Sequence, residues 1–94
     1  MFDWQMEYAV VCTYSWVHDA VVKLYETEED AIEAMEKDFT VEVTNDTEAG
    51  HDFDIYVSSD NRYCKITNYR PWSGTDVTEW RVVKIETGRR REEA

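Results

Sequence analysis

The chain of 94 residues is short of the features that mark specialised classes of protein. It has two cysteines, Cys12 and Cys64, which form no C-x-x-C pair, so we expect two free, buried thiols and no disulfide framework. No apolar run approaches the roughly 18 residues that a membrane span needs. The first eight residues contain no Lys or Arg, unlike the start of a secretory signal. We therefore expect a soluble, cytoplasmic protein.

Motifs of catalysis and metal binding are also missing. No G-x-S-x-G occurs, and His18 and His51 fall in predicted loops without a Ser or Cys partner. The spacing of the histidines and cysteines matches no zinc pattern, and the acidic segment 45–56 does not match a calcium-binding EF-hand loop. These absences predict a protein that is not an enzyme, with no cofactor and no metal site.

Basic residues are scarce, since 10 Lys and Arg stand against 21 Asp and Glu, a net charge of -11. Thirteen of these acids and one base lie between Glu26 and Asp60, which gives that segment a charge of -12 and leaves +1 for the rest. Phosphate binding uses Lys and Arg, so direct binding to nucleic acid is disfavoured. The negative charge comes from the middle third of the chain.

Two β-branched and aromatic runs near the start of the chain predict a hairpin. The first is Tyr8–Tyr14 (YAVVCTY) and the second is Ala20–Glu26 (AVVKLYE). The loop between them, Ser15–Asp19, is expected to carry Trp16 and Val17 near its tip.

A second hairpin is predicted from Phe53–Val57 and Arg62–Asn68, because the Asp and Asn residues between them tolerate tight-turn conformations. A loop with Trp72 and the only proline follows, and then a long last strand, Val77–Glu86. We expect one domain over residues 1–87 and a frayed polar tail over 88–94.

The middle of the chain predicts one helix. Thr27 followed by three acids is an N-cap with a first turn that complements the helix dipole. An apolar stripe at steps of three, four and four comes next, formed by Ile32, Met35, Phe39 and Val43. The helix is expected to end before Asn45–Gly50, whose composition is that of a loop.

These elements predict an α+β fold of order β-β-α-β-β-β. An antiparallel sheet of about five strands, with the amphipathic helix packed on one face, is the simplest arrangement that buries the helix stripe.

The acidic segment is the main functional signal. Glu29, Glu33 and Glu36 fall at helical spacing and predict a carboxylate ridge, which we expect to join the loop 45–54 in one negative surface. Exposed tryptophans are frequent at interface hot spots. The predicted partner-binding residues are Glu28, Glu29, Asp30, Glu33, Glu36, Asp46, Glu48, Asp52, Asp54, Trp16 and Trp72. The alternative is that the acids only keep the protein soluble and that the tryptophans cap the ends of the sheet.

Four segments carry a resemblance to other proteins: YAVVCTYS, ETEEDAIEAM, YCKITNYRP and DVTEWRV. They look like a group of small uncharacterised acidic proteins of bacterial genomes and mobile elements, and this resemblance implies a fold but no activity. In size and charge the chain also resembles, by type only, phage-encoded inhibitors such as anti-CRISPR and anti-restriction proteins, several of which mimic nucleic acids.

Two functional hypotheses follow. The first is a non-enzymatic acidic binding protein that docks on a basic, nucleic-acid-binding surface of a partner protein, such as a defence nuclease. The alternative is a self-associating structural or protein-interaction module, with a homodimer as one form, that uses a sheet edge and exposed tryptophans.

Overall fold

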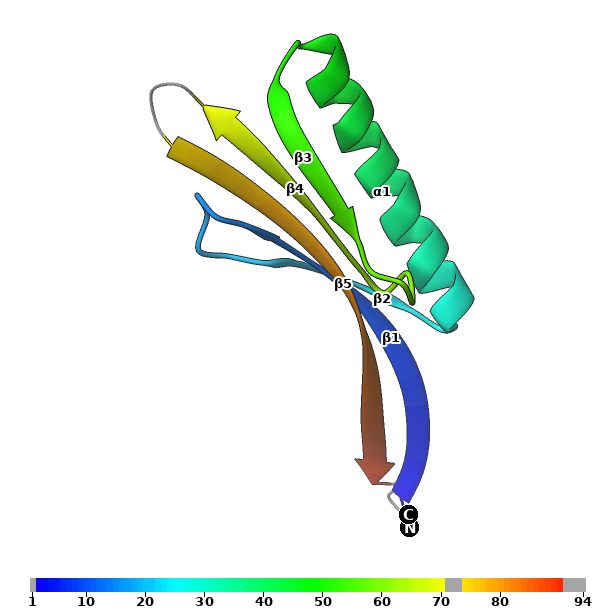
Figure 1. The fold of residues 1–94 in the computed structure, drawn as a ribbon. Coiled ribbons are helices and arrows are strands. Elements are labelled where there is room, and N and C mark those ends of the chain that lie inside the picture. The colour runs from blue at the N-terminus through cyan, green and yellow to red at the C-terminus, as the bar shows by residue number, and fades with distance from the viewer. Residues whose placement is uncertain (1, 71–73, 91–94) are drawn as a thin grey trace.

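The strand-forming runs pair into one five-stranded antiparallel sheet of order β2-β1-β5-β4-β3, and the helix lies across one face of it (Figure 1). The computed structural model describes residues 2–70 and 74–90. Its elements are β1 (Phe2–Tyr14), β2 (Val21–Tyr25), α1 (Glu28–Glu48), β3 (Asp52–Val57), β4 (Tyr63–Arg70) and β5 (Gly74–Arg90). The predicted α+β class and the β-β-α-β-β-β order are confirmed.

Helix α1 begins where the sequence predicts and ends later. The Thr27 hydroxyl oxygen accepts a hydrogen bond from the Asp30 amide at 3.1 Å, as an N-cap should. The predicted end before Asn45 is wrong, because the helix continues to Glu48. Asp46 follows Val43 by three residues on the same face of the helix, where it is buried and accepts a hydrogen bond from Asn68 of β4. This contact joins the last turn of α1 to the sheet.

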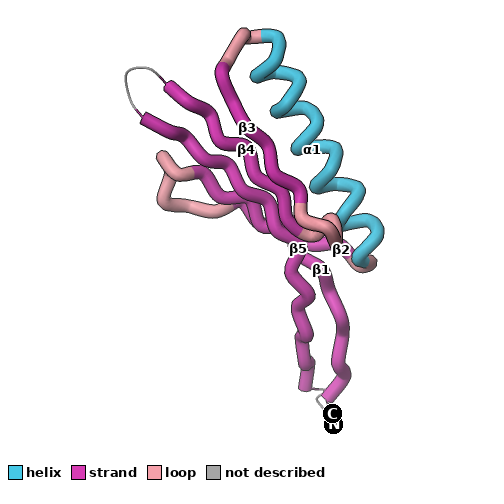
Figure 2. The backbone as a smooth tube through the Cα atoms, in the orientation of Figure 1, coloured by secondary structure: helices cyan, strands magenta, loops and turns pink. Residues whose placement is uncertain are grey.

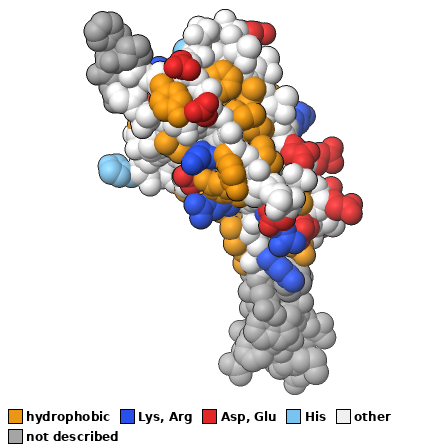
Figure 3. Space-filling model, viewed as in Figure 1, with side chains coloured by type: hydrophobic (Ala, Val, Ile, Leu, Met, Phe, Trp, Pro, Cys, Tyr) orange, Lys and Arg blue, Asp and Glu red, His pale blue; other side chains and the backbone are white. Residues whose placement is uncertain are grey.

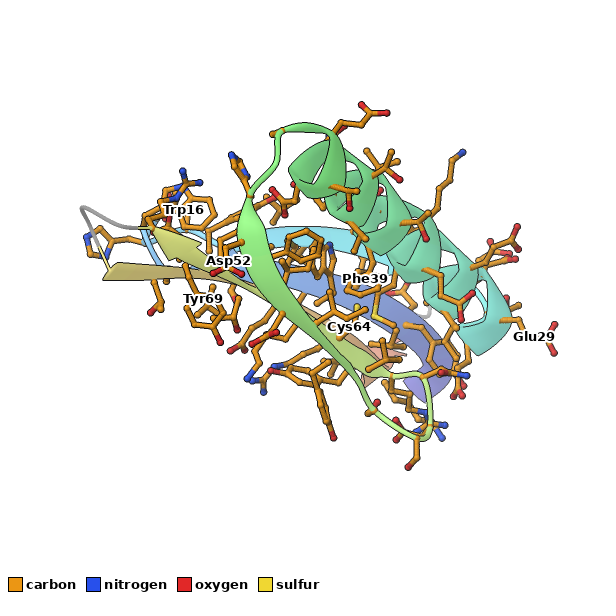
Figure 4. The ribbon with its side chains drawn as sticks, turned by 45° about the horizontal axis from the view of Figure 1, so that its top comes forward. Trp16, Glu29, Phe39, Asp52, Cys64 and Tyr69 are labelled. Carbon is orange, nitrogen blue, oxygen red and sulfur yellow. The ribbon has the colours of Figure 1, made fainter. Side chains whose placement is uncertain are left out.

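The core is centred on a row of three side chains that lie opposite one another on adjacent strands. Cys12 of β1 and Cys64 of β4 flank Trp80 of β5, and all three are buried. Helix α1 covers this row with Met35 and with Phe39, whose ring meets Trp80 edge-on at 5.7 Å between centroids. Figure 4 shows Phe39 and Cys64 between the helix and the sheet. Edge-to-face packing of this kind adds to the area that the rings bury.

Both predicted hairpins are confirmed. The β3–β4 turn contains Asn61 at φ 58°, a left-handed conformation that Asn tolerates better than most residues. The Ser58 hydroxyl donates to Asp60 at 2.6 Å, and Asp60 in turn accepts from the Arg62 amide. Polar side chains therefore fix this turn, as its composition indicated.

Strands β1 and β5 are longer than predicted. They pair from Phe2 opposite Arg90 to Tyr14 opposite Thr78, and their far halves continue beyond the other strands as a two-stranded ribbon (Figure 2). The molecule is therefore elongated, with extents of 62 × 25 × 19 Å and a radius of gyration of 16.8 Å, against about 12 Å for a compact chain of this length. Residues 88–90 belong to β5 and not to the expected tail, and 91–94 lie outside the described residues.

Candidate interaction surfaces

Helix α1 carries the largest group of exposed carboxylates. We call this group the acidic helix surface, and it consists of Glu29, Asp30, Glu33, Glu36, Asp38, Glu42 and Glu48. Within the described residues none of the seven forms an ion pair, and α1 holds one base, Lys37. Glu29 points away from the body in Figure 4. The structure thus brings the predicted ridge together and extends it along the helix.

At about 100° per residue, the ridge of Glu29, Glu33 and Glu36 lies on one flank of α1. Asp38 and Glu42 lie on the other flank, beside a groove of about 250 Å³ between the helix and strands β1 and β2. Figure 3 shows acidic side chains along the side of the molecule that the helix occupies. Asp38 and Glu42 therefore face this groove, whereas the ridge lies on the opposite flank, and the carboxylates form no single line.

Glu28 does not contribute a free carboxylate to this surface. It is half-buried, and both of its carboxylate oxygens accept hydrogen bonds from the Arg62 guanidinium, at 2.7 and 2.8 Å. Both hydrogen bonds come from one guanidinium nitrogen, Nη2, and they are charge-assisted, so they are stronger than hydrogen bonds between neutral groups. Glu28 therefore links the first turn of α1 to the start of β4.

Asp46 is also unavailable to a partner. Its side chain is buried at the end of α1, where one oxygen accepts from the Asn68 amide at 3.2 Å and the other lies 2.9 Å from His51 Nδ1. The sequence placed Asp46 among the surface acids because its helical position could not be recognised. Its role in the structure is to fasten the helix to β4.

Asp52 and Asp54 lie on the other side of the sheet from α1. Side chains alternate along a strand, and Phe53, between them, packs against the core under the helix. Tyr69 donates a hydrogen bond to Asp54 at 2.7 Å, and this contact raises the pKa of Tyr69. The structure does not bring these two carboxylates together with the helix ridge, so the expected joint surface is not formed.

The loop between β1 and β2 holds Trp16, whose exposed fraction is 56%. Its ring packs against the Tyr14 ring, with 5.2 Å between the two centroids. The expected position of Trp16 near an exposed hairpin tip is confirmed. Trp72 lies outside the described residues.

Three arginines are held by acids of the sheet or of the helix. Arg62 contacts Glu28, Arg70 contacts Asp76, and Arg81 contacts Glu79 at 3.0 Å. Two of the acids involved, Asp76 and Glu79, lie outside the acidic segment of the chain. Among the described residues, these arginines therefore form no ion pair with the seven carboxylates of the acidic helix surface.

The face of the sheet opposite α1 is covered by no other element among the described residues. We call it the open face, and its central members are Val22, Leu24, Ala9, Val11, Val83, Arg81, Tyr63, Lys65, Glu79 and Tyr56. Sequence reasoning identified the strands but missed this surface. The signal was present in adjacent apolar residues along single strands, such as Val10 and Val11. A strand with one solvent-exposed face has alternating apolar and polar residues instead.

Burial keeps both thiols protonated. Burial raises the pKa of the Cys64 thiol to about 12, and burial likewise raises that of Cys12. A thiol kept protonated is a poor nucleophile and a poor metal ligand. Within residues 2–70 and 74–90, no three His, Cys, Asp or Glu side chains come together as metal ligands.

No family model, curated protein or solved structure matches this chain. In the part of the chain that the structure describes, no helix combines the length and apolar character of a membrane span.

Proposed function

We propose that this chain is a non-enzymatic binding protein that docks its acidic helix surface on a basic surface of a partner protein. The observation that carries the proposal is the set of seven exposed carboxylates on α1 beside one lysine. Surfaces of one charge sign raise the rate of encounter with the opposite sign and repel like-charged molecules. Such a surface selects a basic partner and excludes nucleic acid itself.

The partner that fits best is a nucleic-acid-binding protein, such as a defence nuclease. Carboxylates one helical turn apart are separated by roughly 6 Å along the axis. Phosphates recur every ~3.4 Å along one strand of duplex. A rigid helix with this charge density can occupy a channel lined by Lys and Arg, which is how a phage or mobile-element inhibitor of anti-CRISPR or anti-restriction type would act.

The test compares two double charge reversals. Glu29→Lys with Glu33→Lys changes the helix, and Asp52→Lys with Asp54→Lys makes the same change of charge on the other side of the sheet. Both are measured against purified nucleases with Lys- and Arg-lined channels, by binding and by inhibition of cleavage across salt concentrations. Wild type should bind at least one of them, with affinity that falls as salt rises.

We expect the helix variant to bind at least about 10-fold more weakly, because it replaces attraction by like-charge repulsion. The strand variant should bind within about 2-fold of wild type, since its changes lie on the other face. Equal losses in the two variants, or binding without salt dependence, would refute docking through the helix.

A second function is favoured by Trp16. A tryptophan more than half exposed in a connecting loop is suited to an interface hot spot, and β2 beside it is an edge strand of the sheet. This alternative is a protein-interaction or structural module that uses the edge and the tryptophan. A complex that survives reversal of the helix charges but is lost in Trp16→Ala would support it.

A further inference from the structure

The groove of about 250 Å³ between α1 and strands β1 and β2 lies on the helix side of the sheet, and we call it the β1–β2 groove. Val10 and Cys12 of β1 and Trp80 of β5 line it and are buried. In the strand register, Cys12 lies between Val21 and Trp80, so these side chains continue across three adjacent strands. The floor of the groove is therefore mainly apolar.

The walls of the groove are apolar side chains that remain open to solvent. Val21 of β2 is 46% exposed and Val41 of α1 is 51% exposed, although both line the groove. An apolar group placed between the two walls would remove this surface from water, which is favourable. Pockets for whole small molecules measure roughly 300–1,000 Å³. The β1–β2 groove is smaller and is suited to a single side chain.

The groove also has an excess of negative charge. Asp38 and Glu42, one helical turn apart on α1, both line it. Lys23 of β2 lines it as well. Within residues 2–70 and 74–90, none of these three side chains forms an ion pair. Two negative charges therefore stand against one positive charge.

The pKa values of two groups that line the groove report the sign of its electric field. Burial raises the pKa of Cys12, and the charges of Asp38 and Glu42 raise it further. Each of these charges affects Cys12 more than the charge of Lys23, which lowers the pKa. The pKa of Tyr14 is raised to about 12, first by its hydrogen bond with Cys12 and by burial, and then by the same two carboxylates. The interior of the groove is therefore negative and favours a cation.

An arginine side chain combines the groups that this groove can bind. Its methylene stem can lie against apolar side chains while its charged end stays near water. Its planar guanidinium has five N–H donors, which suits two carboxylates one helical turn apart better than the compact ammonium of lysine. The guanidinium can also stack on an aromatic ring, and the Tyr14 ring lines the groove.

We infer that the β1–β2 groove receives one arginine side chain of the basic partner, an inference that rests on the docking function proposed above. Asp38 and Glu42 bind the guanidinium, while Val21 and Val41 contact its stem. With the arginine bound, the groove holds two charges of each sign. Arginine is frequent among the side chains that fill pockets at interface hot spots, so this contact anchors the complex.

Titration followed by nuclear magnetic resonance tests the groove without a partner protein. The probe is the peptide acetyl-Gly-Arg-Gly-amide, and the control peptide has citrulline, which is uncharged and similar in shape, in place of arginine. We expect the arginine peptide to shift the amide signals of groove residues and to saturate in the millimolar range. The citrulline peptide should bind at least about 10-fold more weakly, because it lacks the charge.

Three variants locate the binding site. Asp38→Asn with Glu42→Gln should lower the affinity for the arginine peptide at least about 10-fold. Glu29→Gln with Glu33→Gln removes the same charge from the opposite flank of α1 and should bind within about 2-fold of wild type. Val21→Trp keeps every charge and places a large ring in the groove, so it should weaken binding at least about 5-fold. All five side chains are exposed, so the fold should persist, as circular dichroism would verify.

The absence of a saturable shift in wild type would overturn the inference, and so would equal binding of the two peptides. Equal losses in the two charge-removing variants, or unchanged binding by Val21→Trp, would also overturn it. Either result would mean that the helix attracts arginine without holding it in the groove.

The groove and the docking function fail separately. If a nuclease binds Asp38→Asn with Glu42→Gln as tightly as wild type, docking stands and the groove inference fails. If no nuclease binds but the peptide results are as expected, the groove is an arginine site and the nuclease is the wrong partner.

Discussion

At the scale of single residues, Asp46 shows how burial changes what a carboxylate does. By sequence it is one acid among many in the middle third, but its oxygens accept from Asn68 and lie beside His51 within the fold. The other amide atom of Asn68, Oδ1, is buried without a hydrogen-bond partner in the described structure. The Asn68 amide group therefore depends on Asp46 for its hydrogen bonding.

We expect Asp46→Ala to lower the free energy of unfolding by about 1–3 kcal/mol, because the buried Asn68 amide then has no acceptor. Urea denaturation measures the loss. Glu48→Ala, at an exposed position two residues on, is the control and should change stability by less than about 0.5 kcal/mol. Equal effects of the two substitutions would show that Asp46 is not an anchor.

The buried thiol predicts how stability depends on alkaline pH. Burial first, and then the neighbouring Cys12 thiol, raise the pKa of Cys64 from 9.0 to about 12. The unfolded chain therefore loses this proton first, and stability should fall as pH rises from about 9 toward 12. Unfolding free energies measured over this range should fall less steeply in Cys64→Ala, and an equal slope would contradict the prediction.

At the scale of elements, the termination of α1 depends on Gly50. This residue has φ of 71°, and the last helical carbonyls are bonded by the amides of Ala49 and Gly50. A left-handed residue just after a helix is usually Gly because other side chains crowd the backbone there. Gly50 thus separates α1 from β3. The composition of residues 45–50 did not reveal that the helix continues to Glu48, two residues before Gly50.

We expect Gly50→Ala to lower the free energy of unfolding by about 1 kcal/mol, because a left-handed conformation strains an L residue. No atom lies within 4 Å of the added Cβ, so a clash does not add to this cost. Gly50→Asn should lose less, since Asn tolerates this conformation. Thermal and urea unfolding of the two variants compare these costs, and identical stability of wild type and Gly50→Ala would contradict the strain argument.

The strands show which parts of an element a sequence determines. The runs YAVVCTY and VTEWRVVKIE were recognised because β-branched and aromatic residues fit a pleated, half-buried surface. Their extensions to Phe2 and to Arg90 were missed. The pairing of β1 with β5 brings these segments together, and local composition does not report contacts with a strand more than seventy residues away.

At the scale of the whole molecule, the net charge of -11 is distributed unevenly between the two layers. The exposed carboxylates of α1 lie on one side, while the sheet pairs Arg70 with Asp76 and Arg81 with Glu79. Repulsion is therefore concentrated along the helix, where like charges one turn apart each cost a few tenths of a kcal/mol.

Added sodium chloride should therefore raise the melting temperature, because it screens repulsion within the folded chain. The variant Glu29→Lys with Glu33→Lys has a net charge of -7, since each reversal adds +2 to -11. We expect its melting temperature to rise less with salt than that of wild type in differential scanning calorimetry. A rise as large as that of wild type would place the repulsion elsewhere in the molecule.

The sequence by itself determined the class of fold, the start of the helix, the two hairpins and the burial of both thiols. These depend on capping, periodicity and composition over a few neighbouring residues. Only the tertiary structure decided that Glu28 and Asp46 are held inside ion pairs and hydrogen bonds, and that Asp52 and Asp54 lie across the sheet from the helix ridge. The side of the sheet that a strand residue faces depends on the strand register, and the direction of Asp46 depends on where α1 ends. Long-range packing determines both.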